Sequence, residues 1–256
     1  MEFSVHLRVG ATLAVALRQR RNSFISLGEM RKMYHCSQGD RKGRPYAGKR
    51  NSTINWNLKG MNVMIRLAAE GDIPAMLAIY GPYVLETAYS FEYTVPTREE
   101  FKDRFAHHTH YCPWLVWEED GRVLGYAYGA PAFQRAAYGW CAEISVYLSP
   151  EIQGRGIGRR LYRALEQLLF KQGYQVIYAI VTSENTPSIL FHRALGYEIR
   201  AEFPGCGIKF GRRLGTVWLE KRLETVEIPA KFPYAWEEFV QNGENIKNIL
   251  DNLCLF

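Results

Sequence analysis

The pattern of apolar and polar positions separates a regular body from two flanks that lack such regularity. Short apolar runs between turn residues predict strands at 63–67, 114–118, 123–130, 142–148 and 175–181, with two more before Arg222. Apolar residues at spacings of three and four predict helices after Asp72, from Thr97, over 155–172 and over 185–195. This order predicts an α/β protein with a mixed, largely antiparallel central sheet flanked by helices.

The flanks suggest a three-part organisation. Residues 1–60 carry twelve Lys/Arg and three Asp/Glu, a net charge of +9, whereas the other 196 residues carry a net charge of −3. Residues 37–60 are rich in Gly, Lys, Arg, Asn and Ser, which is typical of an unpacked linker. We therefore expect a basic appendage at 1–60, a folded domain at 61–223 and a partly helical tail at 224–256.

Composition and cysteine spacing narrow the class of protein. The apolar content of 47% is that of a globular chain with a core. The five cysteines are widely spaced and form no CxxC pair or zinc-type Cys/His cluster. We therefore expect no metal and a reducing, cytoplasmic location. Because no apolar run is long enough for a membrane span and the basic charge lies outside the body, we expect neither a membrane nor a nucleic acid as partner.

A glycine-rich loop follows the strand at 142–148 and opens the longest predicted helix. It consists of Gln153, Gly154, Arg155, Gly156, Ile157 and Gly158. Backbone amides at a helix N-terminus bind anions, and glycine lets the backbone approach a ligand closely. The loop lacks the third glycine of a dinucleotide-binding motif and the Gly-Lys-Ser/Thr of a P-loop. The loop therefore predicts a phosphate-binding site, but its spacing excludes the NAD and ATP motifs. Arg159 and Arg160 add positive charge beside Arg155 at this site.

Two segments resemble the GNAT acetyltransferase superfamily. V-Y-L-S-P-x-x-Q-G-R-G-I-G is similar to its acetyl-CoA motif Q/R-x-x-G-x-G/A, and Asn185-Thr186-Pro187-Ser188 with the later Phe191-His192…Gly196-Tyr197 is similar to its N…FYxxxGF segment. More narrowly, residues 65–223 resemble the phosphinothricin N-acetyltransferase family, through the Ser-Phe-Glu loop near Phe91 and the Arg135…Tyr138-Gly139-Trp140 segment. The resemblance implies the GNAT acyl-CoA N-acyltransferase fold and acetyl-CoA as co-substrate.

The resemblance also assigns residues to acetyl-CoA. The strand before the loop is expected to separate from its neighbour, so that the backbone of Val146, Tyr147 and Leu148 bonds to the pantetheine arm. The amides from Gln153 to Gly158 are expected to hold the pyrophosphate. Asn185 and Ser188 are expected to contact the pantetheine or thioester end.

Acetyl transfer to an amine needs a base, stabilisation of the carbonyl oxygen and a proton for the leaving thiolate. An α-amino group with a pKa of roughly 7.7–8.0 needs only a modest base. Glu143 is the candidate, because it lies beside the aromatic segment and the resemblance implies a catalytic glutamate at this position. The ordinary alternative is a solvent-facing glutamate. Most of the superfamily uses a tyrosine where this chain, like the phosphinothricin subfamily, has His192. His192 is assigned to proton donation or substrate binding; the alternative is a helical histidine without a role.

The acceptor side depends on Phe91, Arg135 and Tyr138, which match positions that line the subfamily's substrate pocket. The guanidinium fork of arginine suits a carboxylate or phosphinate. We therefore expect acetylation of a small amino-acid-like amine such as phosphinothricin, methionine sulfoximine or methionine sulfone. The resemblance alone implies a homodimer. The alternatives are acetylation of a protein N-terminus, polyamine or aminoglycoside, and a non-catalytic acyl-CoA-binding sensor. A third, supported by charge alone, is nucleic-acid binding through the basic residues 1–60.

Overall fold

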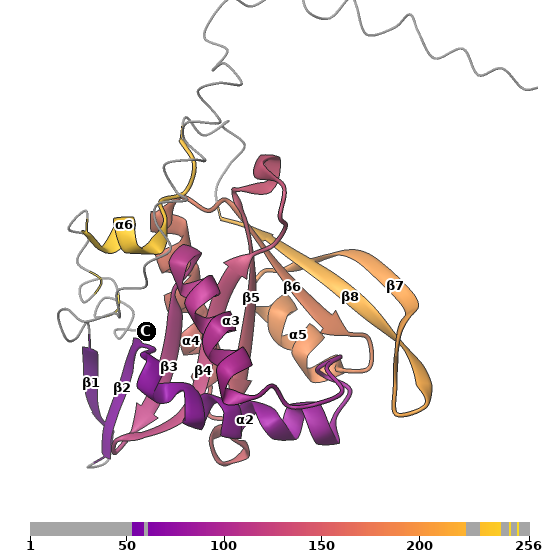
Figure 1. Cartoon of the computed structure of the whole chain (residues 1–256), viewed down its shortest axis with the longest axis horizontal. Coiled ribbons are helices and arrows are strands. Elements are labelled where there is room, and N and C mark those ends of the chain that lie inside the picture. The colour runs from indigo at the N-terminus through magenta and orange to yellow at the C-terminus, as the bar shows by residue number, and fades with distance from the viewer. Residues whose placement is uncertain (1–52, 59–60, 224–230, 242–245, 247–249, 251–256) are drawn as a thin grey trace, which may run out of the picture. The chain divides into compact units, whose positions relative to one another are not determined.

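The computed structural model describes residues 53–58, 61–223, 231–241, 246 and 250, and its described strands form a single eight-stranded sheet in the order β1-β2-β3-β4-β5-β6-β8-β7 (Figure 1). Among these strands every neighbouring pair is antiparallel except β5–β6. The expected mixed, largely antiparallel sheet is confirmed. The strands are β1 (Thr53–Leu58), β2 (Met61–Leu67), β3 (Trp114–Glu119), β4 (Arg122–Pro131), β5 (Cys141–Leu148), β6 (Val176–Thr182), β7 (Glu198–Lys209) and β8 (Arg212–Arg222).

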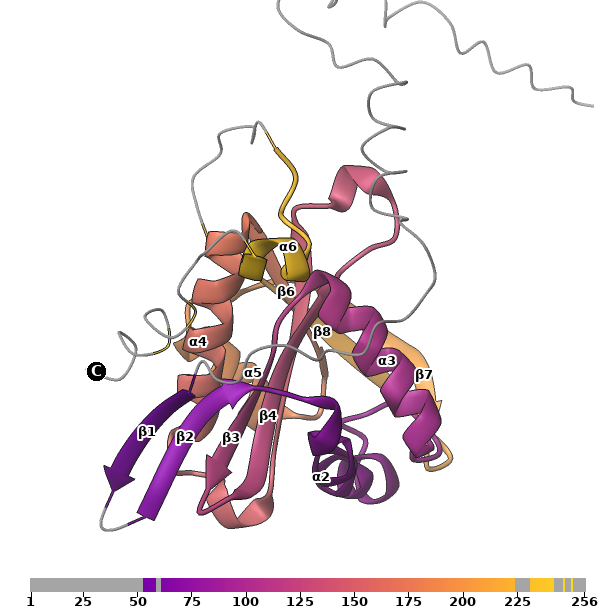
Figure 2. The same ribbon diagram turned by 60° about the vertical axis from the view of Figure 1, so that its left-hand side comes forward.

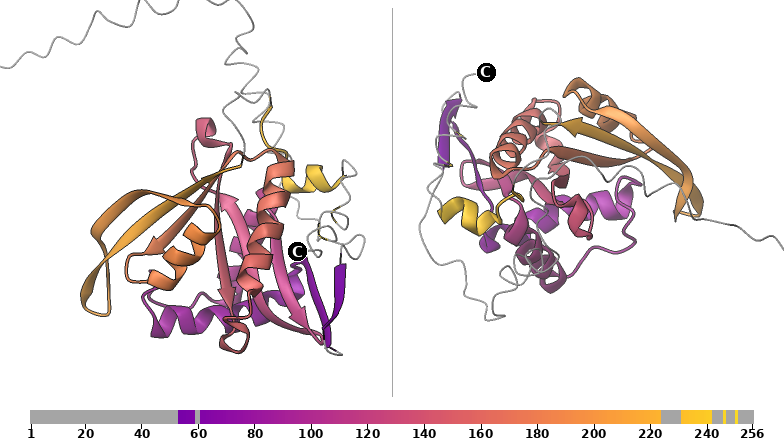
Figure 3. Two further views of the ribbon diagram at one scale, coloured as in Figure 1. Left: turned by 180° about the vertical axis from the view of Figure 1, so that it is seen from behind. Right: turned by 90° about the horizontal axis from the view of Figure 1, so that it is seen from above.

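Helices cover both faces of the sheet. Figures 1 and 3 show α2 (Ile73–Glu86) and α3 (Arg98–Tyr111) on one face and α4 (Ile157–Gln172) and α5 (Thr186–Ala194) on the other. Helix α6 (Trp236–Gln241), in the C-terminal tail, lies beside the ends of α3 and α4 (Figure 2). Short 3-10 turns are η1 (Glu70–Asp72), η2 (Ala136–Tyr138) and η3 (Pro150–Ile152). Within the described residues, no helix has the length and apolarity that crossing a membrane requires.

Two local signals set element ends where the sequence predicts them. Thr97 caps α3: its hydroxyl accepts from the Glu100 amide, and the Glu100 carboxylate accepts from the Thr97 amide at 2.7 Å. Asp120 and Gly121 both have positive φ, +47° and +79°, which is the geometry of a tight type I′ hairpin turn between β3 and β4.

The sheet begins earlier than the composition indicates. β1 pairs with β2 from Thr53 opposite Arg66 to Leu58 opposite Met61. It lies inside the stretch 1–60 that the composition assigns to an appendage, so the expected boundary at residue 60 is wrong for residues 53–58. The strict alternation of T-I-N-W-N-L is a strand signal that the surrounding Gly, Lys and Asn residues obscure. The rest of that stretch, 1–52 and 59–60, lies outside the described residues.

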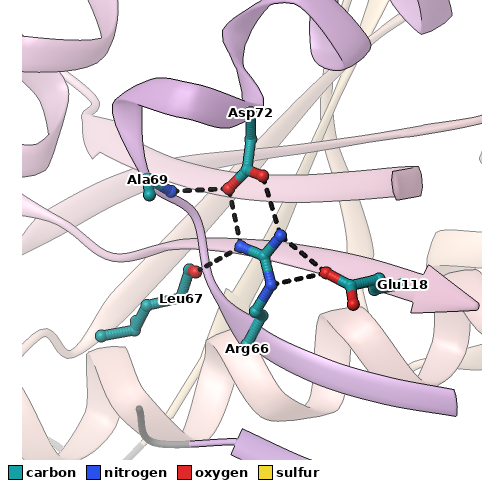
Figure 4. A network of polar contacts seen from close by, with 5 residues as sticks. All are labelled: Arg66, Leu67, Ala69, Asp72 and Glu118. Carbon is teal, nitrogen blue, oxygen red and sulfur yellow. Dashed lines mark hydrogen bonds and ion pairs between the residues drawn. The ribbon is translucent and has the colours of Figure 1, made fainter. Parts of the chain in front are cut away.

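A partly buried ion network joins strands β2 and β3 to the start of α2 (Figure 4). The Arg66 guanidinium on β2 donates to both carboxylate oxygens of Asp72 at 2.7 and 2.8 Å, and its Nε donates to Glu118 on β3 at 2.8 Å. Asp72 also accepts from the Ala69 amide at 2.7 Å. The hydrogen bond to Asp72 raises the pKa of Arg66, so the group stays charged. This network fixes where α2 leaves the sheet.

Arg66→Met is expected to lower the free energy of unfolding by about 2–3 kcal/mol, since it leaves two carboxylates without their counter-ion. The matched control is Lys102→Met, because the Lys102–Glu70 ion pair is more than half exposed on both sides and should be worth less than about 1 kcal/mol. Urea unfolding of both variants measures the difference. Equal losses for Lys102→Met and Arg66→Met would contradict the structural role of the network.

Candidate active site

The glycine-rich loop connects β5 to the N-terminus of α4. Gly154 and Gly156 have φ of +73° and +77°, the left-handed region that favours glycine, and Gly156 is the N-cap of the helix. The first turn of α4 contains no acidic residue, so its amides and helix dipole face no competing carboxylate. A cavity of about 790 Å³ opens over the loop and is also lined by Arg159 and Arg163. The loop therefore has the backbone geometry and charge of an anion site.

The side chains of the loop hold it in place. Gln153 donates to the Tyr83 hydroxyl at 3.1 Å, and that hydroxyl donates to the Leu148 carbonyl at 2.7 Å. Arg155 donates twice to Glu119 on β3, at 2.6 and 3.2 Å. The Arg155 guanidinium is therefore engaged with Glu119, and the positive charge over the loop comes from the α4 arginines instead.

The sheet opens next to this loop. Strands β5 and β6 pair at three positions, the last being Glu143 opposite Tyr178; within the described residues no β6 partner follows. Val146, Tyr147 and Leu148 remain paired with β4 on their other edge. Figure 3 shows β6, β7 and β8 turning away from β3–β5. The cleft between the two strands is lined by Ile144, Ser145, Val146, Tyr147, Tyr162, Ala179, Ile180, Val181, Thr182, Asn185, Ser188 and His192, among others.

Leu148 differs from its neighbours on the open edge. Its carbonyl accepts from Tyr83, and its amide lies 3.4 Å from the same hydroxyl. The Tyr83 side chain on α2 therefore occupies the polar groups of Leu148, where the sequence predicts a contact with an extended ligand arm. Val146 and Tyr147 have no such side-chain partner on their backbone among the described hydrogen bonds.

Glu143 lies at the point where β5 and β6 separate. Along the strand it shares a face with Ser145 and Tyr147, and it is half-buried. Burial raises the pKa of its carboxyl group above the ordinary value. No hydrogen bond or ion pair to its carboxylate is found among the described residues. A desolvated carboxylate without a counter-ion is a stronger base than one in water, as general-base chemistry requires.

His192 is buried on α5 and bonded at both ring nitrogens. Nδ1 lies 2.7 Å from the Ser188 carbonyl, which can only accept, so Nδ1 carries a proton. Burial lowers the pKa of His192 to about 4, so the ring is neutral near pH 7. Nε2 must then accept the hydroxyl proton of Tyr162 on α4, 2.9 Å away. In this arrangement His192 does not offer a proton at Nε2; the hydroxyl of Tyr162 stands beside it.

Asn185 and Ser188 begin α5 at the wall of the cleft. The Asn185 side-chain oxygen accepts from the Ser188 amide at 3.2 Å and so caps the helix. Its amide nitrogen makes no hydrogen bond among the described residues, and Asn185 lines the cleft. The two residues predicted at the thioester end thus lie together with His192.

The predicted acceptor residues lie on two different segments. Arg135 precedes η2 and is exposed, and Tyr138 packs on Phe133 with ring centroids 4.7 Å apart. Phe91 lies in the loop after α2, against Gly207 of β7, where any Cβ would overlap its ring. No ring contact joins Phe91 to Tyr138 within the residues that the structure describes. The geometry therefore brings Arg135 and Tyr138 together and leaves Phe91 on a separate wall.

Lys209 on β7 anchors the loop that carries Phe91, and the sequence gives no sign of this. Its buried ammonium donates to three carbonyls at the end of α2 and in the loop: Val84 (2.7 Å), Thr87 (2.9 Å) and Ser90 (2.6 Å). A cation at a helix C-terminus also complements the helix dipole. The contact spans more than a hundred residues of sequence, so local pattern cannot predict it.

Lys209→Met is expected to lower the free energy of unfolding by about 3 kcal/mol, because it leaves buried carbonyls without a donor. Arg213→Met on the neighbouring strand is the control, since among the described residues Arg213 makes one exposed hydrogen bond of 3.5 Å and should change stability by less than about 0.5 kcal/mol. Chemical denaturation reports both values. A Lys209 variant as stable as the Arg213 variant would show that the loop is held by other contacts.

Tyr162 and Lys209 are the functional candidates that sequence reasoning misses. Tyr162 follows Leu161 on the apolar side of α4 and is buried like a core residue, so only its contact with His192 distinguishes it. Within the described part of the chain, no group of three His, Cys, Asp or Glu side chains could hold a metal ion.

The chain is similar in sequence and structure to known acetyltransferases. The chain is 35% identical over 149 residues to phosphinothricin N-acetyltransferase of Streptomyces viridochromogenes, covering 58% of this chain and 81% of that protein. It is 34% identical over 166 residues to L-methionine sulfoximine/L-methionine sulfone acetyltransferase of Salmonella typhimurium, covering 64% and 97%. The crystal structure of a phosphinothricin acetyltransferase from Sinorhizobium meliloti in complex with AcCoA matches with a TM-score of 0.65 and 32% identity, over 69% of this chain and 98% of that one.

The family match covers the whole site. Residues 65–218, more than half of the chain, match the family described as "Acetyltransferase (GNAT) domain". This range includes the open β5–β6 cleft, the glycine-rich loop and both of the predicted catalytic residues. The chain therefore belongs to the GNAT acetyltransferase family.

Proposed function

We propose that this acetyltransferase moves the acetyl group of acetyl-CoA to the primary amine of a small amino-acid-like acceptor. Phosphinothricin, methionine sulfoximine and methionine sulfone are the candidate acceptors, because relatives at about 35% identity carry those names. The observation that carries the proposal is the opening of the sheet after Glu143, directly beside the anion loop. An extended ligand with a pyrophosphate at one end fits this pair of features.

Backbone groups of the loop and of β5 would bind the donor, acetyl-CoA. Acetyl-CoA supplies the acetyl group as a thioester. The amides from Gly154 to Gly158 would hold its pyrophosphate, and the open edge at Val146 and Tyr147 would bond to its pantetheine arm as an added strand does. Asn185, whose side-chain oxygen caps α5, lines the same cleft, and its amide nitrogen would donate to the pantetheine or thioester end. A backbone N–H near Tyr147 would stabilise the negative charge on the carbonyl oxygen.

Glu143 is proposed as the base that receives the proton of the attacking amine, directly or through one water. Its raised pKa moves it towards the amine's own range of roughly 7.7–8.0, which makes the proton transfer easier. As the C–S bond breaks, the thiolate of coenzyme A, with a pKa of about 8.5, can take a proton near neutral pH. The proton that Glu143 has received from the amine can pass to this thiolate through water, and we propose that His192 contributes by holding the Tyr162 hydroxyl at the cleft where the sulfur leaves.

The acceptor would bind beside the η2 turn. Arg135 is exposed and makes no ion pair among the described residues, so its guanidinium is available for a carboxylate or phosphinate. Tyr138 flanks it, and Phe91 would form a separate wall.

We further propose a homodimer in the cytoplasm. Strand β7 and the turn after it expose apolar side chains that a second copy would cover: Ile199, Phe203, Ile208 and Phe210. The unpaired thiols of Cys112, Cys141 and Cys206 favour a reducing compartment. Light scattering of the purified chain tests the dimer directly, and a monomer at micromolar concentration would rule it out.

A thiol-release assay with acetyl-CoA tests the function. The acceptors would be phosphinothricin, methionine sulfoximine, methionine sulfone, the free amino acids, a polyamine, an aminoglycoside and a peptide with a free N-terminus. We expect turnover with the amino-acid-like acceptors and much slower turnover with the polycations. Turnover with the peptide alone would favour the protein-acetylating alternative, and binding of acetyl-CoA without any turnover would favour a sensor.

A further inference from the structure

The residue that joins the acceptor segment to β5 is held by the C-terminal tail. Trp140 follows the η2 turn and precedes β5, and its indole N–H donates to the Lys231 carbonyl at 3.0 Å. Its ring stacks on Phe232, with centroids 4.2 Å apart and planes 20° from parallel. We name residues 231–236 the strap. The strap lies beyond the family match, which ends at residue 218.

Gly139 shows how closely the strap approaches. A Cβ at this position would lie 2.8 Å from two ring atoms of Phe232 and 3.1 Å from the Ala136 carbonyl. Any side chain at residue 139 would therefore displace the aromatic ring. Two successive residues of the acceptor segment, Gly139 and Trp140, thus pack against one side chain of the strap.

The other end of the strap is fixed to the core. The Tyr234 amide donates to the Gln172 carbonyl at 3.0 Å, and the fully buried Gln172 side chain donates to the carbonyls of Tyr234 and Tyr111. Trp236 and Phe239 then enter the core as buried residues. Because α3 ends at Tyr111 and α4 at Gln172, the strap connects Trp140 to the C-terminal ends of both helices.

The remaining contacts of the segment leave its tip exposed. The Trp140 carbonyl accepts from the amides of Gln175 and Val176 at 3.0 and 3.2 Å, which fixes its base at the start of β6. Between these attachments the side chains of Arg135 and Tyr138 are exposed, and among the described residues they make no hydrogen bond to the body. On one side Tyr138 packs on Phe133, whose ring lies against Tyr178 and Trp218. On the other side the strap holds the base of the tip at Trp140, so the strap is one of two supports that set the orientation of the tip.

We propose that the strap positions the Arg135–Tyr138 segment and thereby sets the affinity for the acceptor, without acting on the donor site. This inference rests on the acceptor role proposed for Arg135 and Tyr138. The strap contacts the C-terminal end of α4, whereas the anion loop lies at the N-terminal end. Sixteen helical residues place these ends about 24 Å apart. Substitutions in the strap should therefore change the KM for the acceptor and leave the KM for acetyl-CoA unchanged.

Steady-state kinetics of Phe232→Ala in the full chain test the proposal. We expect the KM for phosphinothricin or methionine sulfoximine to rise at least about 5-fold, with the KM for acetyl-CoA and the kcat at saturating acceptor changed less than about 2-fold. Phe232→Tyr keeps the stacking ring and should restore the acceptor KM. Phe239→Leu is the matched control, because it alters a buried aromatic of the same tail that does not touch Trp140.

Hydrogen exchange separates a failure of the strap from a failure of the proposed function. In Phe232→Ala, amides of residues 135–140 should exchange faster than in the original chain, while amides of 153–158 should not change. This readout requires no acceptor, so it stands even if no amine is acetylated. The proposal is overturned if exchange at 135–140 is unaffected, if both KM values of Phe232→Ala rise together, or if Phe239→Leu raises the acceptor KM as much as Phe232→Ala does.

Discussion

Glu143→Gln is expected to lower kcat by about 10²- to 10⁴-fold, since it removes the group that receives the amine proton. The pH dependence should change with it. Burial raises the pKa of Glu143, so the carboxylate ionises only above the usual range for glutamate, and kcat/KM should rise with pH through that ionisation. In Glu143→Gln the rise of kcat/KM that follows ionisation of the carboxyl group should disappear, and only the rise that follows deprotonation of the acceptor amine should remain. Rate measurements across pH with one acceptor provide the comparison.

Stability provides an independent check on Glu143. A carboxyl group whose pKa is raised by folding stabilises the protein at low pH, and this contribution is lost as pH rises through the raised pKa. At pH 7 the Gln variant should therefore be at least as stable as the original chain. The control Glu198→Gln, on exposed β7, should leave both rate and stability unchanged. A full-rate Glu143→Gln enzyme with an unaltered pH profile would remove Glu143 from the mechanism.

Gly156→Asp is expected to raise the KM for acetyl-CoA by about 100-fold, corresponding to about 2.7 kcal/mol. It places a carboxylate at the helix N-terminus where the pyrophosphate would lie, and a side chain on backbone with φ of +77°. Gly156→Ala introduces the backbone strain without the charge. Since no atom lies within 4 Å of a Cβ at this position, the alanine effect should reflect conformation alone.

Gly211 offers the matched control for this series. It has φ of +72° and equally free space, but it lies in the turn between β7 and β8. Gly211→Ala and Gly211→Asp should cost similar stability and leave the acetyl-CoA KM within about 2-fold. If Gly156→Asp and Gly156→Ala raise the KM equally, the loop does not bind an anion.

The donor half of the site is predictable because a short part of the sequence contains it. The strand at Cys141–Leu148, the loop and the helix after it follow one another, and the positive φ of Gly154 and Gly156 is what their glycine spacing indicates. The separation of β5 from β6 is predicted only by the family resemblance, because the pairing of strands that are distant in the sequence leaves no local pattern. The structure bears it out through the pairing that ends at Glu143.

The acceptor half is assembled from distant segments, and this is why the sequence predicts less of it. Lys209 reaches the end of α2 across more than a hundred residues, and Phe232 reaches Trp140 across about ninety. Tyr162 has the position of a core residue until its contact with His192 is known. The same contact shows a neutral His192 bonded to a tyrosine, an arrangement that the sequence does not indicate.

For strand β1 the composition of the sequence is misleading and the alternation of its residues is not. Gly, Lys and Asn around it indicate a linker, yet the period-two alternation of Thr53–Leu58 pairs it with β2. Periodicity responds to the face that a residue occupies, whereas composition averages over both faces of an edge strand. At the boundary of a domain the first signal is the more informative.

The most direct test of the central claim is to identify the product. The full chain would be incubated with isotope-labelled acetyl-CoA and methionine sulfoximine or phosphinothricin, and the amine would be analysed by mass spectrometry. The account predicts that the label appears on the amino group of the acceptor in a one-to-one ratio with released coenzyme A. Release of coenzyme A with the label only in free acetate, or no release with any amine, would contradict it.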